Sequence, residues 1–167
     1  WHDLASSRRL QWCIVTVFLA NIANWGLMNW LPTYLLDARG FSVARMGVFA
    51  SAPFAAGAVG YVLSGYIGDW SLLAAGAGIC AAALAPSGEI SVLFMTVSFF
   101  LLNMAMAVLF TLPLVLVPSG VAGSAFGIVN TGAQIAGFLS PLAIGLVLDA
   151  SARNFVVALL LIVVVLV

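Results

Sequence analysis

The hydrophobic residues of this chain lie in long stretches that contain no charged side chain. These stretches are residues 10–36, 46–68, 70–88, 90–148 and 154–167. A helix that crosses the hydrocarbon core of a bilayer needs roughly 20 mostly apolar residues, so the first two stretches each predict one crossing. The apolar runs do not alternate with polar positions, which favours membrane helices over the strands of a membrane barrel.

The longest of these stretches, 90–148, contains a turn signal near its centre. Pro118, Ser119 and Gly120 separate two apolar segments there, each long enough for a crossing. The whole pattern therefore predicts an all-α integral membrane protein with short connections and six transmembrane helices, at residues 11–35, 43–68, 72–85, 90–116, 121–148 and 154–167.

Two of the predicted helices, 72–85 and 154–167, are too short to cross a bilayer. We therefore expect that a loop is missing from the sequence between Ser71 and Leu72 and that the last helix is truncated. A tight hairpin with a half-crossing helix is the alternative. It is disfavoured because a half-crossing leaves backbone polar groups to be satisfied within lipid.

The composition excludes whole classes of protein. Hydrophobic residues make up 65% of the chain and charged residues 6%, and lysine is absent, whereas soluble domains are about 25% charged. This excludes a soluble enzyme, a nucleic-acid-binding protein and a disordered chain. The lack of lysine also fits a missing loop, because the cytoplasmic loops of membrane proteins are rich in Lys and Arg.

A short repeat links the second and fifth predicted helices. Both end in Gly-x-x-x-Asp, at Gly65–Asp69 and at Gly145–Asp149. The two helices are three crossings apart, so they run in opposite directions through the membrane. Three helices followed by three inverted helices are the building block of many transporters. Chance is the alternative, because the chain has 16 glycines.

Small residues recur every four positions on two of the predicted helices. The sets are Ala52, Ala56, Gly60, Ser64 and Gly68; Gly57, Tyr61 and Gly65; Gly123, Gly127 and Thr131; and Gly132, Ala136 and Ser140. Close backbone approach supplies the contact energy between helices in lipid, so we expect these stripes to lie at helix contacts.

Amide side chains inside the predicted helices are the candidates for binding chemistry. Asn21, Trp25 and Asn29 are spaced by four on one face of the first helix, with Asn24 beside them; Asn103 lies in the fourth helix, and Asn130 and Gln134 are again four apart in the fifth. A buried amide without a partner is costly, so these groups should face either a wet cavity or another helix.

The predicted crossings hold no ionisable residue at mid-membrane depth. Asp37, Asp69, Glu89 and Asp149 all flank the helices, and His2 precedes the first one. These residues cannot form a metal site, a phosphate-binding loop or a catalytic triad. We therefore expect a protein that is not an enzyme and that has no metal and no cofactor.

Several segments resemble the major facilitator superfamily, and in particular its anion:cation symporter branch. Residues 25–42 resemble the seventh helix and the following turn of that branch, and residues 1–12 resemble the linker before it. Gly65–Asp69 is similar to the second copy of the superfamily's loop motif, without its basic part. Residues 123–141 resemble the eleventh helix.

The resemblance implies the C-terminal six-helix half of a twelve-helix transporter, built as 3+3 inverted repeats. Residues 1–10 would end the interdomain linker and residues 11–167 would form the bundle. The missing N-terminal half would carry the coupling carboxylates and the substrate-binding arginine. Carried over by position, the cavity contacts would be Asn24, Trp25, Asn29, Phe110, Thr111 and Asn130, and Asp69 would be a conformational latch.

The function expected from this resemblance is secondary active transport of a small organic anion, such as a sugar acid, by alternating access. Protons would drive this transport, with sodium as the second candidate, and the protein would lie in the bacterial inner membrane. A helical membrane scaffold or assembly subunit that transports nothing is the alternative. A membrane enzyme is disfavoured because the chain lacks a catalytic cluster.

Overall fold

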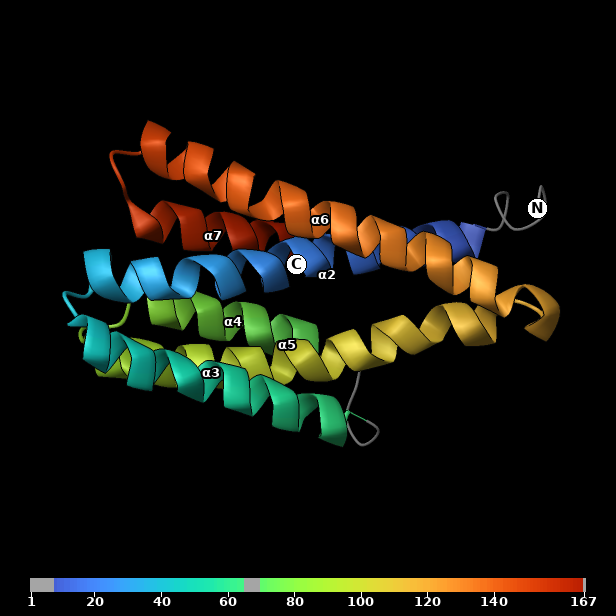
Figure 1. The fold of residues 1–167 in the computed structure, drawn as a ribbon, viewed down its shortest axis with the longest axis horizontal. Coiled ribbons are helices and arrows are strands. Elements are labelled where there is room, and N and C mark those ends of the chain that lie inside the picture. Colours follow the sequence, from blue (N-terminus) through green and yellow to red (C-terminus); the bar gives the residue numbers. More distant parts are fainter. Residues whose placement is uncertain (1–7, 65–69, 167) are drawn as a thin grey trace.

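The computed structural model describes residues 8–64 and 70–166, and these residues are almost entirely helical (Figure 1). They form the α-helices α2 (Arg8–Thr33), α3 (Val43–Leu63), α4 (Ser71–Ala83), α5 (Gly88–Leu116), α6 (Ala122–Ala150) and α7 (Phe155–Leu166). The π-helix η1 (Tyr34–Ala38) extends α2, and the 3-10 turn η2 (Ser119–Val121) precedes α6. The prediction of an all-helical chain is confirmed.

The helix boundaries follow the local signals in the sequence. The predicted turn at Pro118 is confirmed, because α5 ends at Leu116 and α6 begins at Ala122. Ser42 and Ser87 cap α3 and α5, each accepting a hydrogen bond from the backbone N–H three residues later. The first helix begins at Arg8 rather than at residue 11, and Ser71 and Leu72 both lie in the first turn of α4.

Among residues 8–64 and 70–166, four helical segments are long and apolar enough to cross a membrane. They are Arg8–Ala38, Val43–Leu63, Gly88–Leu116 and Ser119–Ala150, whereas α4 and α7 are shorter. Many large apolar side chains on these helices are exposed, for example Val62 and Leu146. Such a surface suits acyl chains rather than water, so the helices are those of a multi-pass membrane protein.

The helices pack around a central pair. α2 and α5 contact each other, and α6 packs mainly on α2 while α3 packs mainly on α5. α4 lies against α5 and α7, and α7 also contacts α2. In Figure 1, α6 and α3 run along opposite edges of the bundle, with the other helices between them.

Glycines bring α3 and α5 into close contact, as the small-residue pattern predicts in part. A Cβ atom at Gly60 would collide with the backbone carbonyl of Phe100, and one at Gly57 would lie 2.8 Å from Nδ2 of Asn103. Nothing lies within 4 Å of the Cβ position at Gly123 or Gly127, so the expected contact of that stripe is wrong within the described chain. Those two glycines stand on the exposed side of α6.

The described ionisable side chains lie at helix ends, as expected. Asp37, Glu89 and Asp149 are exposed, and all three lie at the end where α2, α4 and α6 finish and α3, α5 and α7 begin. We call this the charged end. There Arg45 forms an ion pair with Glu89, and Arg153 forms one with Asp37. The ion pairs thus tie neighbouring helix ends together outside the hydrocarbon.

Replacing Gly60 with alanine should destabilise the bundle. The new methyl group would push α3 away from the Phe100 carbonyl, and overpacking of this kind costs about 1–3 kcal/mol. We expect a lower midpoint of thermal unfolding for the purified protein in detergent. Gly47→Ala on the same helix is the matched control, which should not lower the midpoint because its Cβ meets open space and alanine favours a helix more than glycine does. Equal midpoints for the two variants would contradict this packing.

Candidate functional site

The eight residues predicted to line a cavity lie on three helices that contact one another. α2 carries Asn24, Trp25 and Asn29, α5 carries Asn103, Phe110 and Thr111, and α6 carries Asn130 and Gln134. Asn29, Thr111 and Gln134 are exposed, and the other five are partly buried. We call this set the polar set. The structure therefore brings together the three helices that carry the polar set, although the residues of the set differ in their exposure.

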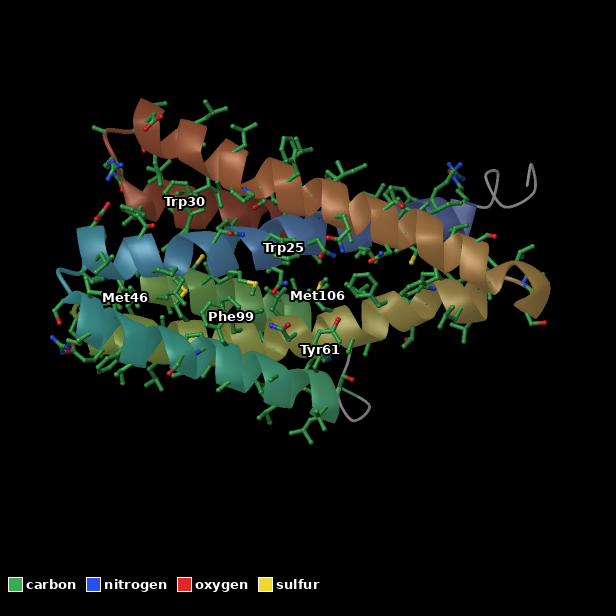
Figure 2. All side chains as sticks on the ribbon, in the orientation of Figure 1. Trp25, Trp30, Met46, Tyr61, Phe99 and Met106 are labelled. Atoms are coloured by element: carbon green, nitrogen blue, oxygen red, sulfur yellow. The ribbon has the colours of Figure 1, made fainter. Side chains whose placement is uncertain are left out.

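The indole of Trp25 is held at the contact between α2 and α6. A Cβ atom at Gly137 would lie 2.9 Å from Nε1 of Trp25, so only glycine leaves room for the ring there. One turn further along, Nε1 of Trp30 donates a hydrogen bond to the carbonyl of Pro141 at 3.2 Å. Figure 2 shows both indoles between these helices. Packing thus fixes the orientation of Trp25.

Ser140 adds a hydrogen bond between the same two helices. Its Oγ donates to the carbonyl of Ile22 at 2.6 Å, and the serine is fully buried. From the sequence, Ser140 was predicted only as a member of a small-residue stripe, and Gly137 only as a glycine of the segment that resembles the eleventh helix. Gly137 and Ser140 are three residues apart, which puts both on one helix face, and this spacing is the sequence feature that could have identified the contact.

Three of the amides donate a hydrogen bond to their own helix. Nδ2 of Asn21, Asn29 and Asn103 each lies 2.8 Å from the carbonyl four residues earlier. One N–H of each amide is thereby satisfied locally, and these bonds do not join two helices. Asn103 also lies against Gly57, so it belongs to the contact of α5 with α3.

Asn24 has the most unusual environment of the polar set. Its Oδ1 atom is buried and accepts no hydrogen bond from any described residue. A buried polar atom without a partner costs about 1–3 kcal/mol, and native structures contain few of them. An acceptor in this condition indicates a place where a donor from outside these helices is needed.

Aromatic rings bring the α5 and α6 parts of the set together. The rings of Phe110 and Phe126 lie 6.2 Å apart between centroids, a tilted pair in the range of favourable aromatic contacts. Phe126 was not among the predicted site residues. Its position four residues before Asn130, on the same helix face, is the signal that could have included it.

The polar set contains no ionisable side chain, so its electrostatics come from amide and hydroxyl dipoles. Within residues 8–64 and 70–166 no cluster of three potential metal ligands is present. The surface can therefore donate and accept hydrogen bonds and stack against a ligand, but its own residues cannot transfer a proton. Asp69, the predicted latch, lies outside the described residues.

The family model described as "Major Facilitator Superfamily" matches residues 1–141. "Probable sulfoacetate transporter SauU" of Cupriavidus necator is 32% identical, over 84% of this chain and 37% of the relative. "Probable galactarate/D-glucarate transporter GudP" of Pseudomonas putida is 26% identical over 169 aligned positions, 90% of this chain and 36% of the relative. Its namesake of Bacillus subtilis is 30% identical, over 84% and 33%. The chain spans about a third of the length of these relatives.

Replacing Asn24 with leucine should raise the stability of the protein in the absence of any ligand. The change removes a buried acceptor that has no donor and keeps a side chain of similar size, so we expect a gain of about 1–3 kcal/mol. The measurement is the thermal unfolding midpoint in detergent. Asn21→Leu is the matched control, because Asn21 is also buried on α2 but is hydrogen-bonded to Val17. A midpoint that falls equally in both variants would refute the interpretation.

Proposed function

The chain belongs to the Major Facilitator Superfamily, and from this premise we propose that it is part of a secondary active transporter of small organic anions. The observation that carries the proposal is the shared chemistry of the relatives' named substrates. Sulfoacetate, galactarate and D-glucarate are all small acids that are anionic at neutral pH. The family is one of transporters, so the neutral polar set is a surface for binding rather than for catalysis.

We propose that the six helices are two inverted repeats, α2–α4 and α5–α7, and form the C-terminal half of a twelve-helix transporter. The packing supports this arrangement, because exchanging the two units preserves the main contacts. α3 of the first unit packs on α5, the first helix of the second unit, and α6 packs on α2 in the same way. The two first helices also contact each other at the centre, as do the two last ones.

A second transmembrane half would pack against the exposed side of α6. Gly123, Gly127 and Thr131 form a stripe of small residues there, and no described residue approaches the two glycines. Small residues allow close helix contact in lipid, which makes this stripe suitable for another helix. The groups that bind protons, or sodium as the second candidate, and the cation that binds the substrate would belong to that half.

We also propose that residues are missing between Ser71 and Leu72. α4 has 13 residues, about 20 Å of helix, which is shorter than the roughly 30 Å of a hydrocarbon core. The alignment with the Pseudomonas putida relative supports the proposal. It extends over 169 positions but covers 90% of the 167 residues of this chain, so the relative has residues without a counterpart here.

In this proposal the polar set binds the uncharged part of the substrate during alternating access. The free Oδ1 of Asn24 suits a hydroxyl donor, which a sugar acid provides. Asn29, Asn130 and Gln134 add amide groups, and Trp25 and Phe110 supply apolar surface. Rocking of the two halves about a site near the midplane would then expose the bound anion to each side in turn.

Transport itself is tested by uptake of labelled D-glucarate into cells that express the complete gene and lack other carriers for it. Asn130→Ala should raise KM about tenfold with little change in expression, because a hydrogen bond to a charged or polar ligand is lost. Asn21→Ala, at a buried amide outside the polar set, is the control and should change KM little. Unchanged kinetics for Asn130→Ala would remove this residue from the site, and absence of all uptake would favour the scaffold.

Asp69, which follows α3 in the sequence, is proposed as a conformational latch. A carboxylate there would pair across the two halves in one conformation only, so it would act on the rate of interconversion and not on the site. Asp69→Asn should therefore lower the maximal rate of uptake severalfold while substrate binding, measured on the purified protein, stays the same. A normal turnover rate would exclude the latch.

A further inference from the structure

A pocket of about 530 Å³ opens at the charged end of the bundle, away from the polar set. It lies where η1, the end of α4 and the start of α7 meet, and its walls include Tyr34, Asp37, Arg39, Arg153, Asn154 and Phe155. None of the eight residues of the polar set lines it. The pocket therefore needs an explanation separate from the proposed transport site.

Arg39 is a half-buried cation in this wall that has no carboxylate partner among the described residues. Its Nε donates to the hydroxyl of Tyr34 at 2.7 Å, and its two terminal nitrogens donate to the carbonyls of Ala85 and Ala82 at 2.9 and 3.0 Å. A guanidinium has five N–H donors, so two remain beyond these three bonds. The neutral partners hold the group rigidly but do not cancel its charge.

The contacts of Tyr34 hold the Arg39 guanidinium still more rigidly. The ring of Tyr34 is buried, and its hydroxyl is hydrogen-bonded to Oγ of Ser91 at 2.7 Å. Ser91 in turn donates to the carbonyl of Ala82, which also accepts from Arg39. The guanidinium is thereby fixed by three helical segments, η1, α4 and α5, before any ligand arrives, which lowers the entropic cost of binding.

Arg153 supplies a second cation to the lining of the pocket. Its guanidinium lies 2.7 Å from a carboxylate oxygen of Asp37, but its side chain is 68% exposed. Ala152 and Arg153 have φ angles of 52° and 62°, a left-handed conformation that is unfavourable for residues other than glycine. The strained turn places the arginine at the pocket. The lining of the pocket thus contains two guanidinium groups and one carboxylate.

We propose that this pocket binds the phosphate group of an anionic phospholipid. Paired arginines match the oxyanion chemistry of phosphate, and a basic pocket between the ends of membrane helices lies at headgroup depth. The helices that flank the pocket continue into an apolar surface suited to acyl chains, with Leu84 of the α4 end 72% exposed and Val164 of α7 76% exposed. A lipid can therefore meet its charge and its tails at the same site.

The test uses the complete protein, purified in a neutral detergent and titrated with phosphatidylglycerol, with bound lipid counted by native mass spectrometry. Arg153→Gln should weaken lipid binding about threefold to tenfold, the effect of one charge-assisted contact near a surface. Asp37→Asn should strengthen it, because Arg153 then loses its competing carboxylate. Arg45→Gln is the matched control: it removes a cation from the same end, but from an ion pair that does not line the pocket.

The opposite signs of the two variants separate a lipid site from a structural ion pair. If Asp37→Asn and Arg153→Gln weaken lipid binding equally, the pair only holds the fold and the proposal is overturned. Glycerol 3-phosphate tests whether the pocket binds a soluble phosphate, and phosphatidylcholine tests whether it binds any phospholipid. Binding of soluble glycerol 3-phosphate as tightly as the lipid, or of phosphatidylcholine as tightly as phosphatidylglycerol, would also overturn it. None of these measurements depends on transport, so a negative result here would not contradict the transport proposal, and a negative uptake result would not contradict the lipid site.

Discussion

The interior of a bilayer offers polar groups no partner except the protein itself, and the arrangement of this chain depends on that constraint. Backbone groups are satisfied within helices, and the amides of Asn21, Asn29 and Asn103 return their donors to their own helix carbonyls. The described charged groups are confined to the helix ends. Within such a molecule, the unpartnered oxygen of Asn24 is an exception that calls for a donor from elsewhere.

The same constraint explains how the helices hold together. Lipid gives apolar helices no reason to associate, so contact comes from close approach and from a few interhelical hydrogen bonds. Examples of such contacts are Gly60 against Phe100, Gly137 against Trp25 and the hydrogen bond from Ser140 to Ile22. These contacts fix the relative positions of the helices that carry the polar set. A binding surface requires side chains that are held in fixed positions.

The two regions with possible ligand chemistry differ in kind. The polar set is neutral and lies along the helices, so it suits contacts that form and break as a substrate passes. The charged end combines the rigidly held guanidinium of Arg39 and the exposed guanidinium of Arg153 with apolar flanks, so it suits a ligand at the membrane surface. In the described residues, the two ion pairs at the charged end are thus separate from the neutral amides along the helices.

The sequence alone predicted the class of the protein, the approximate positions of its helices and the turn at Pro118, because a crossing is a long local pattern of apolar residues. The repeated glycines likewise indicated which helices approach closely, but not which face of each is used. Only the tertiary structure decided that Gly57 and Gly60 meet α5 while Gly123 and Gly127 meet no described residue. Only the tertiary structure paired Phe110 with Phe126, left Asn24 without a donor and joined Arg153 to Asp37 across 116 positions. These contacts depend on how helices distant in sequence rotate against one another, and helical periodicity alone does not specify that rotation.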